Sequence, residues 1–187
     1  MNTTLTALKN LSFSAILWLF TFAFVLHELE EWNIMDWYWR NYTNLPPEAT
    51  HSSARTWIVF ICLVWVAWCA AATLPGKPKL AAFVFLPAVA LAFQNALQHI
   101  YWTFYFQQYA PGVVTAVLLQ IPLGLYILAR VVQEGYTPLW YIGVWFALIV
   151  PGLVQTVKAG NEMTSPIRAI HLLGIRLSGM LSQFTPH

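Results

Sequence analysis

The stretch LSFSAILWLFTFAFVLHELEE, residues 11–31, decides the fold. Its first sixteen residues carry no charged side chain, and the chain then runs directly into a histidine and three glutamates. An uncharged run of this kind is typical of a membrane-spanning helix, which needs about 20 mostly apolar residues. The run is too long for a signal peptide and has no small-residue cleavage site before His27, so we interpret it as a helix that stays in the protein.

The rest of the chain has the same apolar composition. Of its 187 residues, 59% are hydrophobic and 9% are charged, whereas a soluble domain carries about 25% charged residues. This excludes a soluble globular protein, and a net charge of +2 without a basic run excludes nucleic acid as a partner. We predict one all-α, membrane-embedded domain over residues 1–187, with five transmembrane helices at about 11–31, 54–74, 79–107, 111–132 and 138–158.

The C-terminal segment, residues 166–184, differs from the five spans. At 100° per residue, its apolar side chains fall on one side (Ile170, Leu173, Leu177, Leu181 and Phe184) and its polar side chains on the other (Arg168, His171, Arg176, Ser178 and Gln183). This pattern predicts an amphipathic helix that lies in the membrane interface. We expect its polar side, with His171, to face water.

Lysines and arginines predict the orientation of this multi-pass protein. If the N-terminus with Lys9 is cytoplasmic, the loop with Lys77 and Lys79 is cytoplasmic too, and the acidic first connection lies outside. The basic residues after residue 157 oppose this rule, so the side of the C-terminal helix stays open. The first connection is also aromatic, which predicts an interfacial belt formed by Trp32, Trp37, Tyr38, Trp39 and Tyr42.

Two of the predicted helices each carry a polar triplet on one face. His27, Glu30 and Glu31 stand at positions i, i+3 and i+4, so they share a face while Glu28 points elsewhere. The third span repeats this spacing with Asn95, Gln98 and His99.

The two triplets are also expected at one depth. The 18 residues from Lys9 to His27 correspond to about 27 Å of helix, and the 20 residues from Lys79 to His99 to about 30 Å. Both helices run in the same direction, so both histidines reach one layer near the extracytoplasmic surface. The same count places four further polar residues in that layer: His51, Arg55, Thr115 and Gln155. Ionisable groups in a span normally face the bundle and pair with each other or with an ion.

We interpret this layer as a site for a divalent metal ion. Imidazole and carboxylate ligands suit zinc, iron or manganese, and two adjacent glutamates also allow a dinuclear centre. We predict His27, Glu31 and His99 as metal ligands and Glu30 as a second ligand or the general base, although the sequence does not decide between the two glutamates.

The other residues of the layer are predicted to orient ligands or hold substrate. These residues are Asn95, Gln98, His51, Arg55, Thr115 and Gln155. Two of them have an alternative interpretation: His51 also suits a solvated loop position, and Arg55 an ordinary interfacial position. A metal-free acid/base site and a purely structural polar cluster are the alternatives to a metal site.

At these residues the chain resembles the HXXEE family of small multi-spanning bacterial membrane proteins. The resemblance rests on His27-Glu28-Leu29-Glu30-Glu31, on NALQH at residues 95–99 and on YAPGVVTAVLLQIPLGLY at residues 109–126. It implies a multi-spanning protein whose histidines and glutamates suggest a metal-dependent enzyme. It supplies neither a reaction nor a substrate.

The preferred function is therefore a metal-dependent membrane enzyme that acts on a lipid or an apolar small molecule entering from the bilayer. The alternative is a non-enzymatic binding or transport protein for a cation, a proton or a small amine; a structural subunit of a larger complex is a third interpretation. A transporter is expected to show polar residues along the cytoplasmic half of its spans or a broken helix at mid-depth, and neither is evident in the sequence.

Overall fold

We analysed a computed structural model, which describes residues 11–183. In this part of the chain five helices are long and apolar enough to cross a membrane: α2 (Phe13–Glu30), α4 (His51–Thr73), α5 (Pro78–Tyr105), the continuous helix formed by α6 (Val113–Thr115), η1 (Ala116–Gln120) and α7 (Ile121–Gln133), and α8 (Leu139–Ala159). The prediction of five helices of spanning length is confirmed, with each bound within three residues of the predicted one. Lys9 and Phe184, which entered the predictions, lie outside the described residues.

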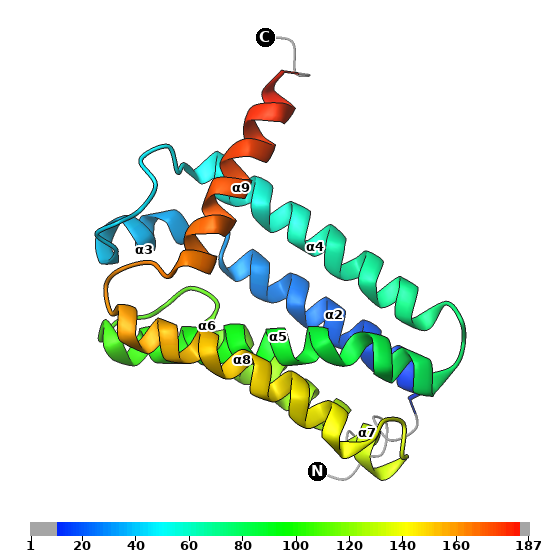
Figure 1. Ribbon diagram of the computed structural model, residues 1–187. Helices are drawn as coiled ribbons and strands as arrows, with labels where there is room; N and C mark the ends of the chain where they lie inside the picture. The colour runs from blue at the N-terminus through cyan, green and yellow to red at the C-terminus, as the bar shows by residue number, and fades with distance from the viewer. Residues whose placement is uncertain (1–10, 184–187) are drawn as a thin grey trace.

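Local sequence signals start the helices. The side chain of Ser12 accepts a hydrogen bond from the amide of Ala15 at the start of α2, and Thr50 and Ser53 form a capping box at the start of α4. Pro78 lies in the first turn of α5, where its missing N–H costs nothing. Successive long helices run in opposite directions (Figure 1), so the ends of α2, α5 and α8 meet the starts of α4 and α6.

Helix α5 is the central helix of the bundle. It packs against α2, α4, α7 and α8, and it buries more of its length than any other helix that could span a membrane. Ala88, Ala92 and Ala96 lie on one face and are fully buried, and His99 follows on the same side. Small residues let helix backbones approach closely. The alanine face therefore brings His99 against the neighbouring helices.

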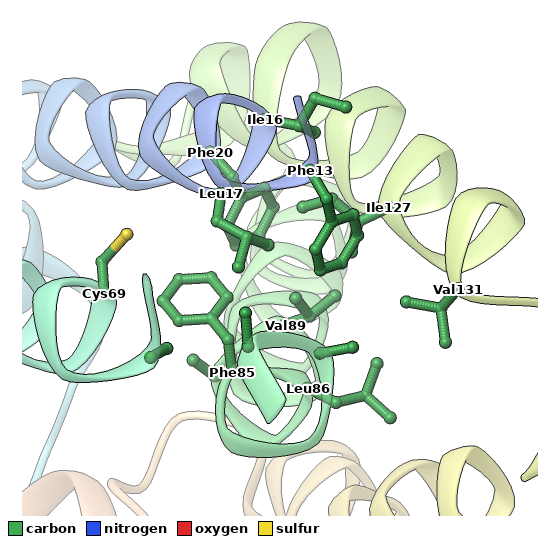
Figure 2. Close-up of a cluster of buried hydrophobic side chains, with 14 of the residues drawn as sticks. Phe13, Ile16, Leu17, Phe20, Cys69, Phe85, Leu86, Val89, Ile127 and Val131 are labelled. Atoms are coloured by element: carbon green, nitrogen blue, oxygen red, sulfur yellow. The ribbon is translucent and has the colours of Figure 1, made fainter. Parts of the chain in front are cut away.

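An apolar core fills the bundle on the side away from the polar layer. Phe20 of α2, Phe85 of α5 and Ile127 of α7 are fully buried in it, as Figure 2 shows. Cys69 lies in the same cluster as a free, buried thiol, and Cys62 is also free. The bundle thus continues below the polar layer as tightly packed apolar side chains.

The first connection folds into a short helix, α3 (Ile34–Asn41), and the predicted aromatic belt is wrong for three of its residues. Trp37, Tyr38 and Tyr42 are buried, and the Trp37 ring lies 5.3 Å from the Trp102 ring, centroid to centroid. Only Trp32 and Trp39 of the predicted belt are exposed. The reason is that α3 folds back onto the end of α5, where the rings form a second core.

The C-terminal helix α9 (Ser165–Ser182) packs across the start of α4 (Figure 1). Its buried residues are Ile167, His171 and Gly174, so the prediction that His171 faces water is wrong. Gly174 explains the difference: a Cβ on it would lie 2.6 Å from the carbonyl oxygen of Ser53, so the two helices approach closely along this side. Leu173 of the predicted apolar side is instead 41% exposed.

Candidate metal centre

Three side chains from α2 and α5 converge on one point at the polar end of the bundle. The Oε1 atom of Glu31 lies 2.9 Å from Nε2 of His27 and 3.0 Å from Nε2 of His99. Each residue offers one nitrogen or oxygen atom, and these three atoms all lie within 4.8 Å of one another. His27 is in the last turn of α2 and Glu31 directly follows that helix, so the i, i+4 spacing places both on the face turned to α5.

All three residues are withdrawn from solvent. The exposed fraction is 0% for His27, 1% for His99 and 9% for Glu31. Glu31 thus forms a buried ion-pair contact with each imidazole, and Nδ1 of His99 has no hydrogen-bond partner among the described residues. A divalent ion can replace a proton between these groups, because two imidazoles with one carboxylate form a donor set that zinc, iron and manganese accept.

Gly112 closes the cluster from the side of α6. It precedes α6 with a φ of +94°, a left-handed conformation that favours glycine. A Cβ on this residue would lie 2.7 Å from Cε1 of His27, 3.0 Å from Oε1 of Glu31 and 3.0 Å from Cε1 of His99. The absent side chain thus leaves space directly beside all three donor residues.

A hydrogen-bonded chain orients the ring of His27. The Thr115 hydroxyl lies 2.6 Å from Oε2 of Glu30 and 3.0 Å from Nδ1 of His27. Because a carboxylate only accepts, the hydroxyl donates to Glu30, and Nδ1 of His27 then donates to the hydroxyl. This assigns the His27 proton to Nδ1 and leaves the Nε2 lone pair directed at the cluster. Partners of this kind fix the tautomer of metal-binding histidines.

Glu30 is held by the loop and helix start around α6. Its carboxylate accepts hydrogen bonds from the amides of Val114 and Thr115, at 3.1 and 2.8 Å, and from the Tyr109 and Thr115 hydroxyls. Burial and the adjacent carboxylate raise the pKa of the Tyr109 hydroxyl, so it remains a donor. We expected Glu30 to be a second ligand or the general base, but both of its oxygens are engaged here, outside the cluster.

A known family covers this part of the sequence. The profile of a family described as a protein of unknown function with an HXXEE motif matches residues 18–127, more than half of the chain. The chain belongs to the HXXEE family. No curated protein and no solved structure matches it. The motif of the HXXEE family is His27 to Glu31 here, and its two glutamates have separate positions: Glu31 joins the histidines, whereas Glu30 binds the start of α6.

A polar cavity of about 90 Å³ adjoins the HXXEE motif on the side of α9. It has room for several water molecules, since one needs about 10–15 Å³. Its polar lining comes from Glu28, Glu31, Tyr38, Ser53, Asn95, Gln98, His99 and His171. Asn95 lines this cavity, and its Oδ1 atom is buried. Glu28, at an unspecified position of the HXXEE motif, was predicted to point elsewhere but is 6% exposed and lines this cavity.

The structure places Gln98 beside the cavity and Gln155 on the surface. Gln98 lines the cavity and donates to the Thr156 hydroxyl at 3.0 Å, whereas Gln155 is exposed and points outward. Thr156, one residue further along α8, is the buried group, so the prediction named the wrong face of this helix.

His51 and Arg55 both lie away from the donor cluster of the HXXEE motif. The Nε2 atom of His51 contacts Asp36 at 3.2 Å, and Arg55 donates to the carbonyl oxygen of Trp32 and to Oδ1 of Asn33. Sequence reasoning missed Gly112, Glu28 and His171. The Pro-Gly pair before α6 was a visible turn signal for Gly112, but the places of Glu28 and His171 depend on how α9 docks.

Proposed function

We propose that this HXXEE protein binds a divalent metal ion through His27, Glu31 and His99 and uses it as the centre of a membrane enzyme. One observation carries the proposal: donor atoms of His27, Glu31 and His99, all three buried, meet within 4.8 Å among the described residues. A structural ion pair needs only one imidazole beside the carboxylate, whereas a metal ion needs several donor groups at one point.

The donor set indicates which ions fit. Two imidazoles and one carboxylate suit zinc, iron or manganese, and the described residues bring no thiol into the group. When bound, such an ion supplies Lewis-acid or redox chemistry and lowers the pKa of a coordinated water. The chain itself positions His27 through Thr115 and Glu30, shields the donors from bulk water, and presents the polar groups of the adjoining cavity.

The apolar core supports an enzyme rather than a transporter. Beneath His27 and His99, the helices α2, α4, α5 and α7 pack through fully buried groups such as Phe20, Phe85 and Leu86. A transport path needs a row of polar groups or broken helices at this depth. The helices α2 and α5 are continuous here, and the neighbouring helix contains the π-helical turn η1. Two polar side chains, Thr21 and Gln120, are buried beneath the histidines, and two such groups do not make a polar path across the bundle.

The cavity also bears on the substrate. Its many polar lining residues suit the polar group of a substrate better than an acyl chain, so we place the apolar part of the substrate outside. The rim of the cavity includes half-exposed Trp57 and exposed Ile170, which face the surroundings of α4 and α9. We therefore propose a lipid or apolar small molecule that enters from the bilayer with its polar group toward the metal. The positive-inside rule favours the membrane face opposite Lys77 and Lys79 for this site.

Elemental analysis of the purified full-length protein tests the metal site. We expect about one ion per chain in the wild type and a loss of at least tenfold in occupancy for His27→Ala and for His99→Ala. His51→Ala is the matched control, because it removes a histidine that lies outside the cluster. A wild type without stoichiometric metal, or His27→Ala and His99→Ala proteins that retain it, would end the proposal.

A second experiment tests the enzyme. Metal-loaded protein and Glu31→Gln protein are incubated with a total lipid extract, and the lipids are compared by mass spectrometry. We expect a product only with the loaded wild type. In parallel, the protein is placed in vesicles with a metal-sensitive dye inside. Metal entry through the wild type, without any lipid product, would favour transport over catalysis.

A further inference from the structure

A second hollow lies on the other side of the contact between α4 and α9. The two helices touch where Gly174 meets the backbone of Ser53. Before this contact, Ile167 and His171 line the cavity of the metal centre; after it, Leu177 and Met180 line a separate groove of about 770 Å³. Figure 1 shows α9 diverging from α4 beyond this crossing.

The groove has one polar end and one apolar end. Along α4, its lining changes from His51, Ser52 and Arg55 to Thr56, Val59, Phe60 and Leu63, and α9 adds Leu177, Met180 and Leu181. The eight residues from Arg55 to Leu63 correspond to about 12 Å of helix. On α4, a helix that is apolar enough to cross a membrane, the polar end lies at the start of the helix and the apolar end lies further along it. A groove with one polar and one apolar end fits an amphipathic molecule whose polar head group lies at Arg55.

Arg55 is oriented at the polar end but has no acidic partner among the described residues. Its Nε donates to the carbonyl oxygen of Trp32 at 3.3 Å, its Nη2 donates to Oδ1 of Asn33 at 2.7 Å, and its guanidinium lies 5.4 Å from the centre of the Trp32 ring. These contacts use two of its five N–H donors. The nearby carboxylate of Asp36 contacts His51. A fixed guanidinium with free donors is well suited to a phosphate group.

We propose that this groove binds an anionic glycerophospholipid, with its phosphate at Arg55 and an acyl chain along Val59, Phe60 and Leu63. Arg55 explains the preference for a net negative head group, because no carboxylate of residues 11–183 forms an ion pair with it. The apolar walls explain why the ligand is a lipid rather than a free anion. The groove contains none of the donor residues of the metal centre. A failure of the proposed enzyme function would therefore leave this lipid-binding proposal unaffected.

Native mass spectrometry of the full-length protein tests the proposal. The protein is released from detergent micelles that contain equal amounts of phosphatidylglycerol and phosphatidylcholine with identical acyl chains. We expect the wild type to retain phosphatidylglycerol preferentially, and Arg55→Gln to reduce this preference about fivefold, the factor that corresponds to about 1 kcal/mol per interfacial arginine. Arg40→Gln is the control, because Arg40 lies at the end of the neighbouring α3 and outside the groove. Equal retention of both lipids by the wild type, or equal losses in both variants, would overturn the proposal.

A second pair of variants tests the place of the acyl chain. Leu63 in the groove is 64% exposed and Leu118 on η1 is 66% exposed, so the two are matched in accessibility. We expect Leu63→Trp to fill the groove and to lower retention of phosphatidylglycerol at least fivefold, while Leu118→Trp leaves it unchanged. The melting temperature of each variant verifies folding. Unchanged retention in a folded Leu63→Trp protein would contradict the assigned groove even if Arg55→Gln failed to fold.

Discussion

A Cβ atom placed on Gly112 would lie 2.7 Å from Cε1 of His27, closer than two such atoms can approach. The HXXEE protein therefore keeps its donor cluster by omitting one side chain. This relationship makes the glycine before α6 as important for the site as the donor residues, although it offers no ligand atom.

Gly112→Ala is expected to abolish metal binding. The new methyl group would displace His27, Glu31 and His99, and a φ of +94° adds backbone strain of about 1–2 kcal/mol. Gly135→Ala is the matched control: Gly135 has a φ of +63°, but nothing lies within 4 Å of its Cβ position. Elemental analysis should find metal in Gly135→Ala and background in Gly112→Ala. Equal metal contents would mean that Gly112 does not border the ion.

Thr115→Val is expected to weaken metal binding about 10- to 100-fold without removing a ligand. The change deletes the hydroxyl that accepts from Nδ1 of His27 and donates to Glu30, so the ring loses its fixed tautomer. Competition with a chelator of known affinity measures the effect. Thr73→Val is the control, since the Thr73 hydroxyl bonds only backbone carbonyls of its own helix. Identical affinities in both variants would contradict the assigned role of Thr115.

The two glutamates of the HXXEE motif should respond differently to the same change. Glu31→Gln removes the charged oxygen between the two imidazoles, so we expect it to lose the metal. Glu30→Gln should retain the metal with reduced affinity but lower the free energy of unfolding by about 1–3 kcal/mol, because an amide nitrogen cannot accept from the donors at Oε2. Metal analysis and thermal melting of both proteins check this. Metal loss in a folded Glu30→Gln protein would mean that Glu30 is itself a metal ligand.

The sequence was sufficient for the number, approximate bounds and relative depth of the long helices. Hydropathy and length determine these features, because every apolar run must find its own backbone hydrogen bonds in a helix. Parallel direction and equal distance from a lysine then placed His27 and His99 at one level. The structure brings these two rings to 4.9 Å, centroid to centroid.

The sequence was insufficient wherever a single helical step decides the outcome. Positions i+3 and i+4 both lie near residue i on a helix, so the sequence could not separate Glu30 from Glu31. Adjacent positions differ by 100°, so naming Gln155 in place of Thr156 chose the wrong face. Trp37 shows a second reason: an aromatic residue near a helix end suits a membrane interface and a packed core equally well by composition. Only the fold of α3 onto α5 distinguishes these two environments.

The docking of α9 on α4 leads to a prediction about Gly174. Gly174→Ala would place its Cβ 2.6 Å from the carbonyl oxygen of Ser53, and a helix backbone cannot yield as a flexible side chain can. We expect α9 to loosen, seen as faster hydrogen exchange of its amides. Gly179→Ala on the same helix meets nothing within 4 Å and should slow exchange, because alanine favours a helix by about 1 kcal/mol over glycine. Equal exchange in both variants would mean that α9 does not rest on α4.

His171 should make this docking sensitive to acid. Burial lowers its pKa to about 4, although the charge of Glu31 acts in the opposite direction, whereas the unfolded value is about 6.5. The titratable groups that line its cavity are Glu28 and Glu31 of the α2 end, Tyr38 of α3 and His99 of α5. Below pH 6.5 the undocked ring binds a proton that the docked ring does not, so stability falls as the pH decreases toward 4 and then levels off.

At 1.36 kcal/mol per pKa unit, this difference corresponds to a loss of about 3 kcal/mol between pH 6.5 and pH 4. His171→Asn keeps a polar side chain of similar size but cannot take up a proton in this range. We expect hydrogen exchange of the α9 amides to accelerate with falling pH in the wild type, after correction for the intrinsic pH dependence of exchange, and to change much less in His171→Asn. Because all other titrating groups are common to both proteins, the difference between the two profiles isolates His171. Parallel profiles would show that His171 is exposed to water and that α9 lies on the surface.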